Sequence, residues 1–352
     1  MSEGNDGSPD SAAVGCRVLH VLGTDRVSGA ENVIMTMMDQ FVGSDIDMVY
    51  CSPDGPIREA LAARGLAYQP LSALTPRGVR TAARGFDVVH AHDFKASVVA
   101  GQSGFGGRIV SHIHSNPGFV KSWNLFSFVY QGVSRRFDRV VFVSDEAKRE
   151  VVFARAIEGK ARVLYNVVDA ARLRALAGAF EVPQRDVLFL GRLVDLKQPQ
   201  VAIDAVAAAR AAVPALTGRL VGDGDLRAAC ARRIAALGLE DDIALEGFQA
   251  NPYPFVAASR VALMPSTHEG LGLAAMECLA LGVPVLSSGV GGLGDLFAGH
   301  ARFVCGSVEE YAARVVALCD DAYEEAVAEC ASIVAPYLDL ARYADQVREL
   351  YS

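Results

Sequence analysis

The chain has no run of eighteen apolar residues and no C-x-x-C pair. A membrane-spanning helix needs about 20 consecutive apolar residues, so we expect none here. The seven cysteines are odd in number and scattered, which favours free thiols over a disulfide framework or a zinc site. Residues 1–15 lack the basic start and the apolar stretch of a signal peptide. We therefore expect a disordered tail at 1–15 and a cytoplasmic protein.

Basic residues are not in excess either, since the net charge is −8. An acidic protein is a poor non-specific ligand for nucleic acid, so we expect no nucleic-acid partner. The charge is unevenly divided, with a net +2 in residues 1–180 and −10 in residues 181–352. The N-terminal half is thus the part suited to an anionic surface.

The chain begins the same pattern twice. An apolar strand at 17–23 is followed by a polar loop and a helix, and a strand at 186–191 is followed by a loop and a helix from Gln200. Further strands are predicted at 46–51, 86–90, 108–113, 139–143, 162–165, 218–221, 243–246, 260–263 and 283–287. Strands that alternate with helices predict an α/β protein with two doubly wound, Rossmann-like parallel sheets. We place the domains at 16–178 and 179–335, and expect a last helix at 336–352 to pack back on the first.

Two glutamates, Glu269 and Glu277, lie eight positions apart after a predicted strand. A helix starting near Leu273 would place Glu277 on an otherwise apolar face, where a buried carboxylate needs a partner or a ligand with donors. The glycines just before it, Gly270 and Gly272, would expose backbone N–H groups that favour an anion. A nucleotide sugar, with a ribose diol beside a diphosphate, satisfies both features. The alternative is a solvated glutamate after a flexible loop.

Other loops at strand ends carry polar groups. Arg192 and Lys197 could hold a diphosphate, and Gly29 could let a helix start close over a phosphate. The pairs His90/His92 and His112/His114 have a spacing that could hold a metal ion, but only Asp93 accompanies them as an acidic ligand. We expect no metal, with one histidine of each pair facing the cleft and the other packing locally.

Together these segments resemble the retaining glycosyltransferases of family four, the glycosyl transferases group 1, which have the GT-B architecture. The most specific match is Glu269–Glu277, followed by Ala280–Val285 and a glycine loop at 289–295. Weaker matches are Asp87–His92, Val143-Ser144, Val163–Asp169 and 191–197. The chain departs from the family pattern at Ser28, where the family often has glycine, and at Asp295, where it often has glutamate.

The resemblance implies roles for individual residues. Arg192 and Lys197 would hold the donor diphosphate, Glu277 the ribose, and Glu269 the transferred sugar. His114 would lie near the donor sugar and form the catalytic pair with Glu269. Further donor-binding residues would be Gly29, Gly270, Leu271, Gly272 and Leu273. The donor would be a nucleotide-diphosphate sugar, most simply a UDP-sugar, with no cofactor and no metal. Rival functions are a sugar-nucleotide 2-epimerase and a non-catalytic sugar-nucleotide-binding protein.

The acceptor is indicated by residues 117–136, which hold the only tryptophan, Trp123, among aromatic and basic side chains. Aromatic residues mixed with cations are typical of a membrane interface. The alternative is a helix that packs Leu125, Phe128 and Val129 into the core. We expect a lipid-linked or polysaccharide acceptor of cell-envelope assembly and a peripheral membrane contact through 117–136. A soluble small-molecule acceptor is the alternative.

Overall fold

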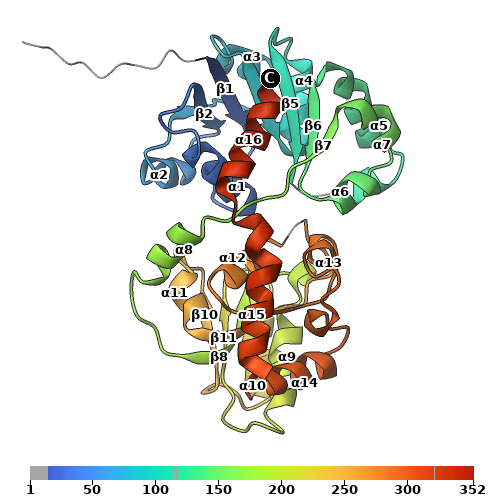
Figure 1. Cartoon of the computed structure of the whole chain (residues 1–352). Coiled ribbons are helices and arrows are strands. Elements are labelled where there is room, and N and C mark those ends of the chain that lie inside the picture. The colour runs from blue at the N-terminus through green and yellow to red at the C-terminus, as the bar shows by residue number, and fades with distance from the viewer. Residues whose placement is uncertain (1–14, 115–116, 271, 321) are drawn as a thin grey trace, which may run out of the picture.

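The computed structural model describes residues 15–114, 117–270, 272–320 and 322–352. The tail expected at 1–15 therefore lies, except for Gly15, outside the described residues, and so does Leu271. Two parallel sheets stand one above the other, each with its own helices (Figure 1). The α/β fold with two doubly wound sheets is confirmed.

The first sheet has seven strands in the order β3-β2-β1-β4-β5-β6-β7. Their bounds are β1 (Cys16–Val21), β2 (Ile46–Ser52), β3 (Tyr68–Pro70), β4 (Val88–His92), β5 (Arg108–Ile113), β6 (Arg139–Phe142) and β7 (Ala161–Val163). Strand β3 was not predicted. Strand β4 lies two residues later than the expected 86–90, because Asp87 serves instead as a turn residue whose carboxylate accepts the N–H of Arg17 at 2.8 Å.

Seven helices of the first domain follow these strands. They are α1 (Gly29–Asp39), α2 (Ile57–Ala62), α3 (Pro76–Ala82), α4 (Asp93–Gln102), α5 (Leu125–Val133), α6 (Asp145–Glu150) and α7 (Ala154–Ile157). Local capping explains several starts: Asn124 and Ser127 form a capping box at α5, and Ser144 caps α6. One face of the sheet packs on α4 and α5, the other on α1.

The second sheet has five strands in the order β10-β9-β8-β11-β12. Their bounds are β8 (Arg185–Leu190), β9 (Gly218–Val221), β10 (Ile243–Gly247), β11 (Ser259–Met264) and β12 (Val285–Ser287). The accompanying helices are α8 (Ala170–Ala177), α9 (Pro199–Ala209), α10 (Arg227–Ala236), α11 (Tyr253–Ala257), α12 (Leu273–Ala280), α13 (Gly292–Leu296), α14 (Val308–Leu318) and α15 (Ala322–Val334). Helix α9 begins at Pro199, which suits a first helical position.

Helix α8 packs against α11 and α12, and its Leu173 belongs to the core of the second sheet. The packing thus assigns α8 to the second domain, although we placed residues up to 178 in the first.

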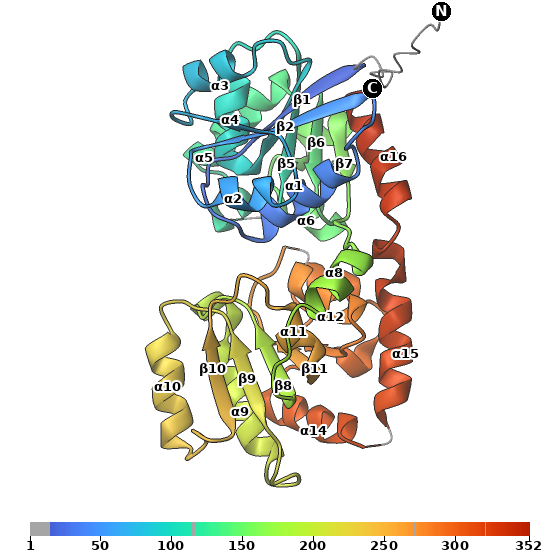
Figure 2. The ribbon, with the colours of Figure 1, turned by 90° about the vertical axis from the view of Figure 1, so that its left-hand side faces the viewer.

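The last helix, α16 (Leu340–Tyr351), crosses back to the first sheet and, with α15, lines one side of both domains (Figure 2). Its Tyr343, Val347 and Tyr351 are buried in the core that includes β1 and α1. Arg348 pairs with Asp45 at 2.6 Å, and the Tyr351 hydroxyl bonds to His90 Nδ1 at 2.7 Å. None of the described helices has the length and apolar character needed to cross a bilayer.

Candidate active site

Glu277 lies in the middle of α12 and is only 9% exposed. It accepts a hydrogen bond from the Tyr253 hydroxyl at 3.1 Å, so the expected partner exists. Burial raises the pKa of Glu277 to about 7, against the opposing effects of Tyr253 and of the Arg64 guanidinium. Because Arg64 follows α2 of the first domain, the charge that acts on this carboxyl comes from across the domain boundary.

Glu269 follows β11 and forms an ion pair with Lys197. The same carboxylate oxygen of Glu269 accepts the Ser266 hydroxyl at 3.2 Å. Both side chains are largely buried, with exposed fractions of 23% for Lys197 and 13% for Glu269. Sequence reasoning placed both residues at one site but did not predict that they pair, since 72 positions separate them.

The glycine loop after β12 packs directly on the segment that holds Glu269. The N–H of Gly292 bonds to the Gly270 carbonyl at 3.1 Å. Gly291 has φ +58°, and a Cβ there would collide with the Glu269 carbonyl, so glycine is required. Gly272 caps α12 with φ +76° and Leu273 is the first helical residue. The helix start was predicted correctly; Leu271, between Gly270 and Gly272, lies outside the described residues.

Arg192 is exposed in the loop after β8. Its guanidinium makes no hydrogen bond or ion pair with the described residues, in contrast to Lys197. The backbone around it is fixed, because Leu193 donates its N–H to the Asp223 carbonyl at 2.9 Å. A Cβ at Gly222 would clash with the Gly191 carbonyl, which explains why the loop after β9 has glycine at this position. Arg192 is therefore an exposed cation, without a bonding partner among the described residues, on a loop whose backbone is held by hydrogen bonds.

On the first domain, Gly29 is the exposed first residue of α1. Ser28 does not cap the helix with its side chain. Instead, Ser28 and Thr24 both donate their hydroxyls to the buried carboxylate of Glu31. Sequence reasoning missed Glu31, although a glutamate three residues after a serine at a helix start is a recognisable signal.

His114 follows β5 and is half-buried. Its Nε2 bonds to His92 Nδ1 at 2.9 Å, and its backbone N–H points to the Asp93 carboxylate at 3.4 Å. Burial lowers the pKa of His114, while Asp93 and Glu31 oppose that shift. The expectation that one histidine of each pair faces the cleft is wrong for His90 and His92, because both are at most 1% exposed.

Two residues other than glycine have positive φ among those described; one follows a residue of a considered histidine pair, and the other follows a predicted site residue. Asp93 has φ +66° and directly follows His92, and Gln198 has φ +51° and directly follows Lys197. Such conformations cost of order 1–3 kcal/mol and are concentrated at functional sites. Asp93 is the first residue of α4, and Gln198 directly precedes α9, so both positions lie at helix starts that follow a strand.

The loops after β6 and β12 bring the two domains together. The N–H of Glu146, in the first turn of α6, points to an Asp295 oxygen at 3.5 Å, and Arg149 lies 4.0 Å from the same carboxylate. Asp295, the departure from the family pattern, therefore makes interdomain contacts. In the described residues no bond links His114 or Gly29 to Lys197, Glu269 or Glu277, so the candidate site consists of two halves, one on each domain.

An apolar patch lies at the start of α5. Half of the ten large apolar side chains that are exposed among the described residues fall within 123–129: Trp123, Leu125, Phe126, Phe128 and Val129. The rings of Trp123 and Phe128 stack with centroids 4.9 Å apart. The alternative in which Leu125, Phe128 and Val129 pack into the core is wrong, because the side of α5 that packs inward carries Ser127 and Tyr130.

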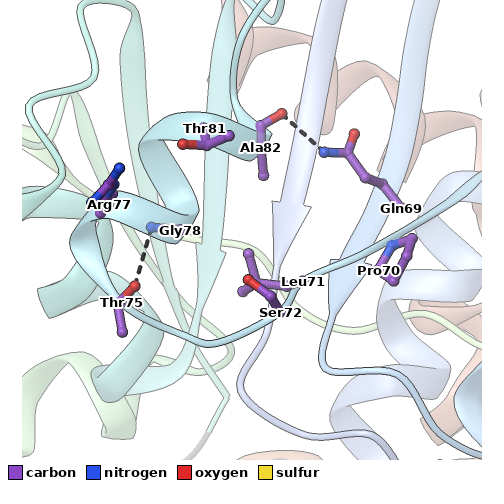
Figure 3. A pocket seen from close by; sticks show the side chains of 9 residues that line it. All are labelled: Gln69, Pro70, Leu71, Ser72, Thr75, Arg77, Gly78, Thr81 and Ala82. Carbon is purple, nitrogen blue, oxygen red and sulfur yellow. Dashed lines mark hydrogen bonds between the residues drawn. The ribbon is translucent and has the colours of Figure 1, made fainter.

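A separate hollow of about 370 Å³ lies between β3 and α3 (Figure 3). Thr75 Oγ1 accepts the N–H of Gly78 there, and Gln69 donates to the Ala82 carbonyl. None of the predicted site residues lines it.

Residues 184–321 match the family described as Glycosyl transferases group 1, and residues 27–172 match Glycosyltransferase Family 4. One relative is a 2-deoxystreptamine glucosyltransferase of Streptomyces kanamyceticus, 39% identical over 130 residues, which are 36% of this chain and 34% of that protein. Another is the lipopolysaccharide core biosynthesis glycosyltransferase LpsE of Rhizobium meliloti, 34% identical over 40% of this chain and 38% of its own length. The matched part thus spans little more than a third of these relatives.

Among solved structures, Anabaena Alr3699/HepE in complex with UDP superposes with a TM-score of 0.79 at 21% identity. The superposition covers 95% of this chain and 98% of that one. A pneumococcal O-GlcNAc transferase, GtfA, in complex with UDP and GlcNAc, gives a TM-score of 0.76 at 12% identity, over 96% of this chain and 98% of that one. These likenesses confirm the GT-B fold. Since the two family matches together account for most of the chain, it belongs to the group 1 and family 4 glycosyltransferases.

Proposed function

We propose that this chain is a retaining glycosyltransferase that moves a sugar from a UDP-sugar to a hydroxyl acceptor. The family supports a transferase, and a related fold in HepE has been solved with UDP-glucose. The acceptor oxygen attacks the anomeric carbon on the face from which the diphosphate leaves. The bond from that carbon to the phosphate oxygen breaks, and the departing phosphate oxygen takes the acceptor proton, so no strong base is needed.

The observation that carries this proposal is the set of groups around the start of α12. Lys197 pairs with Glu269 just before that helix, and the backbone at Gly272 and Leu273 adds helix N–H groups. We assign Lys197, together with Arg192 in the same loop after β8, to neutralise the diphosphate. The buried Glu277 accepts from Tyr253 alone among the described residues, and so retains acceptor capacity for ribose hydroxyls. Glu269, beside Lys197, is assigned to the transferred sugar, and His114 on the opposite domain to the same sugar.

A thermal-shift panel of UDP, GDP, ADP and their sugars tests the donor. A ligand at a hundred times its Kd adds about 2.7 kcal/mol of stability, which raises Tm measurably. We expect the largest shifts from UDP and UDP-sugars. A larger shift from GDP or ADP would overturn the choice of base, and no shift from any nucleotide would overturn the proposal.

We further propose that the acceptor is lipid-linked and that the patch at 123–129 contacts an anionic membrane. Membrane burial of a large apolar side chain is favourable by about 1.5–3 kcal/mol, and this patch exposes Phe126 at 65% and Phe128 at 57%. The neighbouring arginines, Arg135 and Arg136, belong to the more basic half of the chain and suit anionic head groups. The name of LpsE, a lipopolysaccharide core enzyme, agrees with such an acceptor.

Flotation with vesicles that contain anionic phosphatidylglycerol tests the contact. We expect the wild type to float at low salt, and the double variant Trp123→Ser with Phe126→Ser to bind more than about tenfold more weakly. Phe248→Ser is the matched control, because Phe248 is 72% exposed but lies on the second domain. If the wild type stays unbound, the soluble acceptor suggested by the name 2-deoxystreptamine glucosyltransferase becomes the better assignment.

A further inference from the structure

Five of the seven histidines gather on one face of the first sheet. His20 lies in β1, His90 and His92 in β4, His112 in β5, and His114 directly after β5. The strand register places His20 beside His90 and His92 beside His112. All but His114 are at most 1% exposed. Burying so many polar rings is unfavourable unless their nitrogens are bonded, so the array needs an explanation.

Three of the five rings form a hydrogen-bonded series. His20 Nδ1 lies 2.9 Å from His92 Nε2, and His92 Nδ1 lies 2.9 Å from His114 Nε2. Burial lowers the pKa of His20 to about 3 and holds that of His92 well below its usual value. Burial thus favours the neutral form of these rings, and a neutral ring has one N–H donor and one acceptor nitrogen.

The middle ring uses both of its nitrogens, which couples all three. If His92 carries its proton on Nδ1, it donates to His114 and must accept from His20 Nδ1. If it carries the proton on Nε2, both bonds reverse. In either arrangement His20, His92 and His114 are the same tautomer. The outer nitrogens, His20 Nε2 and His114 Nδ1, are buried without a partner in the described residues.

We infer that His92, backed by His20, is a positioning residue that couples the tautomer of His114 to its own and holds the orientation of the His114 ring. The inference rests on the proposed function, in which His114 contacts the transferred sugar. A residue that holds the other nitrogen of a functional histidine selects which ring nitrogen can donate. Here that partner is a second histidine rather than a carboxylate or a backbone carbonyl.

A metal ion is the competing explanation, since two groups of three histidines have nitrogens within 4.8 Å of one another. Hydrogen bonds fit the geometry better. Two nitrogens bound tetrahedrally to one zinc ion at about 2.0–2.1 Å would lie roughly 3.3 Å apart, whereas both pairs here lie at 2.9 Å. Neither group includes a carboxylate to offset a buried divalent charge.

The test compares two buried rings of equal size. His92→Phe removes both hydrogen bonds. His112→Phe is the matched control, because His112 stacks on His114 at 4.3 Å between centroids but bonds through neither nitrogen in the described residues. His92→Asn keeps an amide group near the position of Nδ1, so its kcat should lie between those of His92→Phe and the wild type. We expect His92→Phe to lower kcat about three- to tenfold with little change in donor KM, and His112→Phe to leave both within about twofold.

Ring ¹⁵N NMR of histidine-labelled wild-type protein gives a readout that needs no activity. We expect His20, His92 and His114 to share one tautomer, and His114 to change its tautomer ratio in His92→Phe but not in His112→Phe. A mixed set of tautomers in the wild type, or equal effects of the two phenylalanine variants, would overturn the inference. If His114→Ala leaves activity intact, the proposed role of His114 fails instead, and the NMR result still decides whether the series exists.

Discussion

Glu277→Gln is the change whose effect the structure predicts most directly. The carboxyl is buried on α12, and its pKa is raised to about 7 from an ordinary 4.5. A glutamine has nearly the same shape and cannot ionise, so it mimics the protonated acid. It keeps a side-chain oxygen that can accept from the Tyr253 hydroxyl. The substitution therefore removes the ionisation and little else.

The raised pKa means that the folded chain binds this proton more tightly than the unfolded chain. The resulting stabilisation is fully present below pH 4.5 and is lost as the pH rises through about 7. One pKa unit corresponds to about 1.4 kcal/mol, so the full change is about 3 kcal/mol. The glutamine variant does not lose this contribution. Its stability relative to the wild type should rise by up to about 3 kcal/mol from pH 4.5 to pH 8.

Urea unfolding of both proteins at several pH values between 4.5 and 8 measures this difference. Glu240→Gln, which removes an exposed carboxyl of the second domain, controls for the loss of one charge. If the difference in unfolding free energy between variant and wild type stays constant from pH 4.5 to 8, burial does not raise the pKa of Glu277 and the reasoning fails. In the same variant, UDP affinity at pH 8 should fall, because glutamine lacks the charged acceptor for ribose hydroxyls.

Three further outcomes are expected. Arg192→Ala and Lys197→Ala should each weaken UDP binding in calorimetry by about 1.5–3 kcal/mol, the value of a charge-assisted hydrogen bond, while Arg232→Ala, an exposed arginine of α10, should not. Glu269→Gln should mainly lower kcat and leave UDP affinity equal or higher, since it frees Lys197 from its ion pair; a weaker affinity with unchanged kcat would reverse the assignment. Activity should survive EDTA if, as proposed, Arg192 and Lys197 neutralise the diphosphate in place of a divalent ion; loss in EDTA that Mg²⁺ restores would contradict this.

The fold was predictable where apolar runs are long enough to define buried strands. Strands such as β5 and β9 match their predicted ranges because both faces of a parallel sheet are covered. The missed strand, β3, is three residues long, contains Pro70 and lies at the sheet edge, where a missing N–H is tolerated and the apolar signal is weak. The packing of α8 on α11 and α12 could not be predicted, because helix packing is a tertiary property.

The site was predictable for residues whose position in an element is itself unusual. Glu277 on an apolar helix face is such a case, and its burial is confirmed. His20 is the opposite case, because a single histidine in an apolar strand is usually a packed core residue. Only the register, which sets His20 against His90 and within reach of His92, reveals its role in the series.

What the sequence could not provide is the pairing of these residues. Most candidate groups come shortly after a strand, and strand ends can be recognised in a sequence because apolar runs stop there. Pairing depends on which strand ends become neighbours and on side-chain conformation. Lys197 meets Glu269 because β8 and β11 are adjacent in the second sheet, and Tyr253 meets Glu277 because α11 and α12 both flank β11. Variants that change one member of a pair therefore test the structure itself, since the residue types alone do not predict which partner is affected.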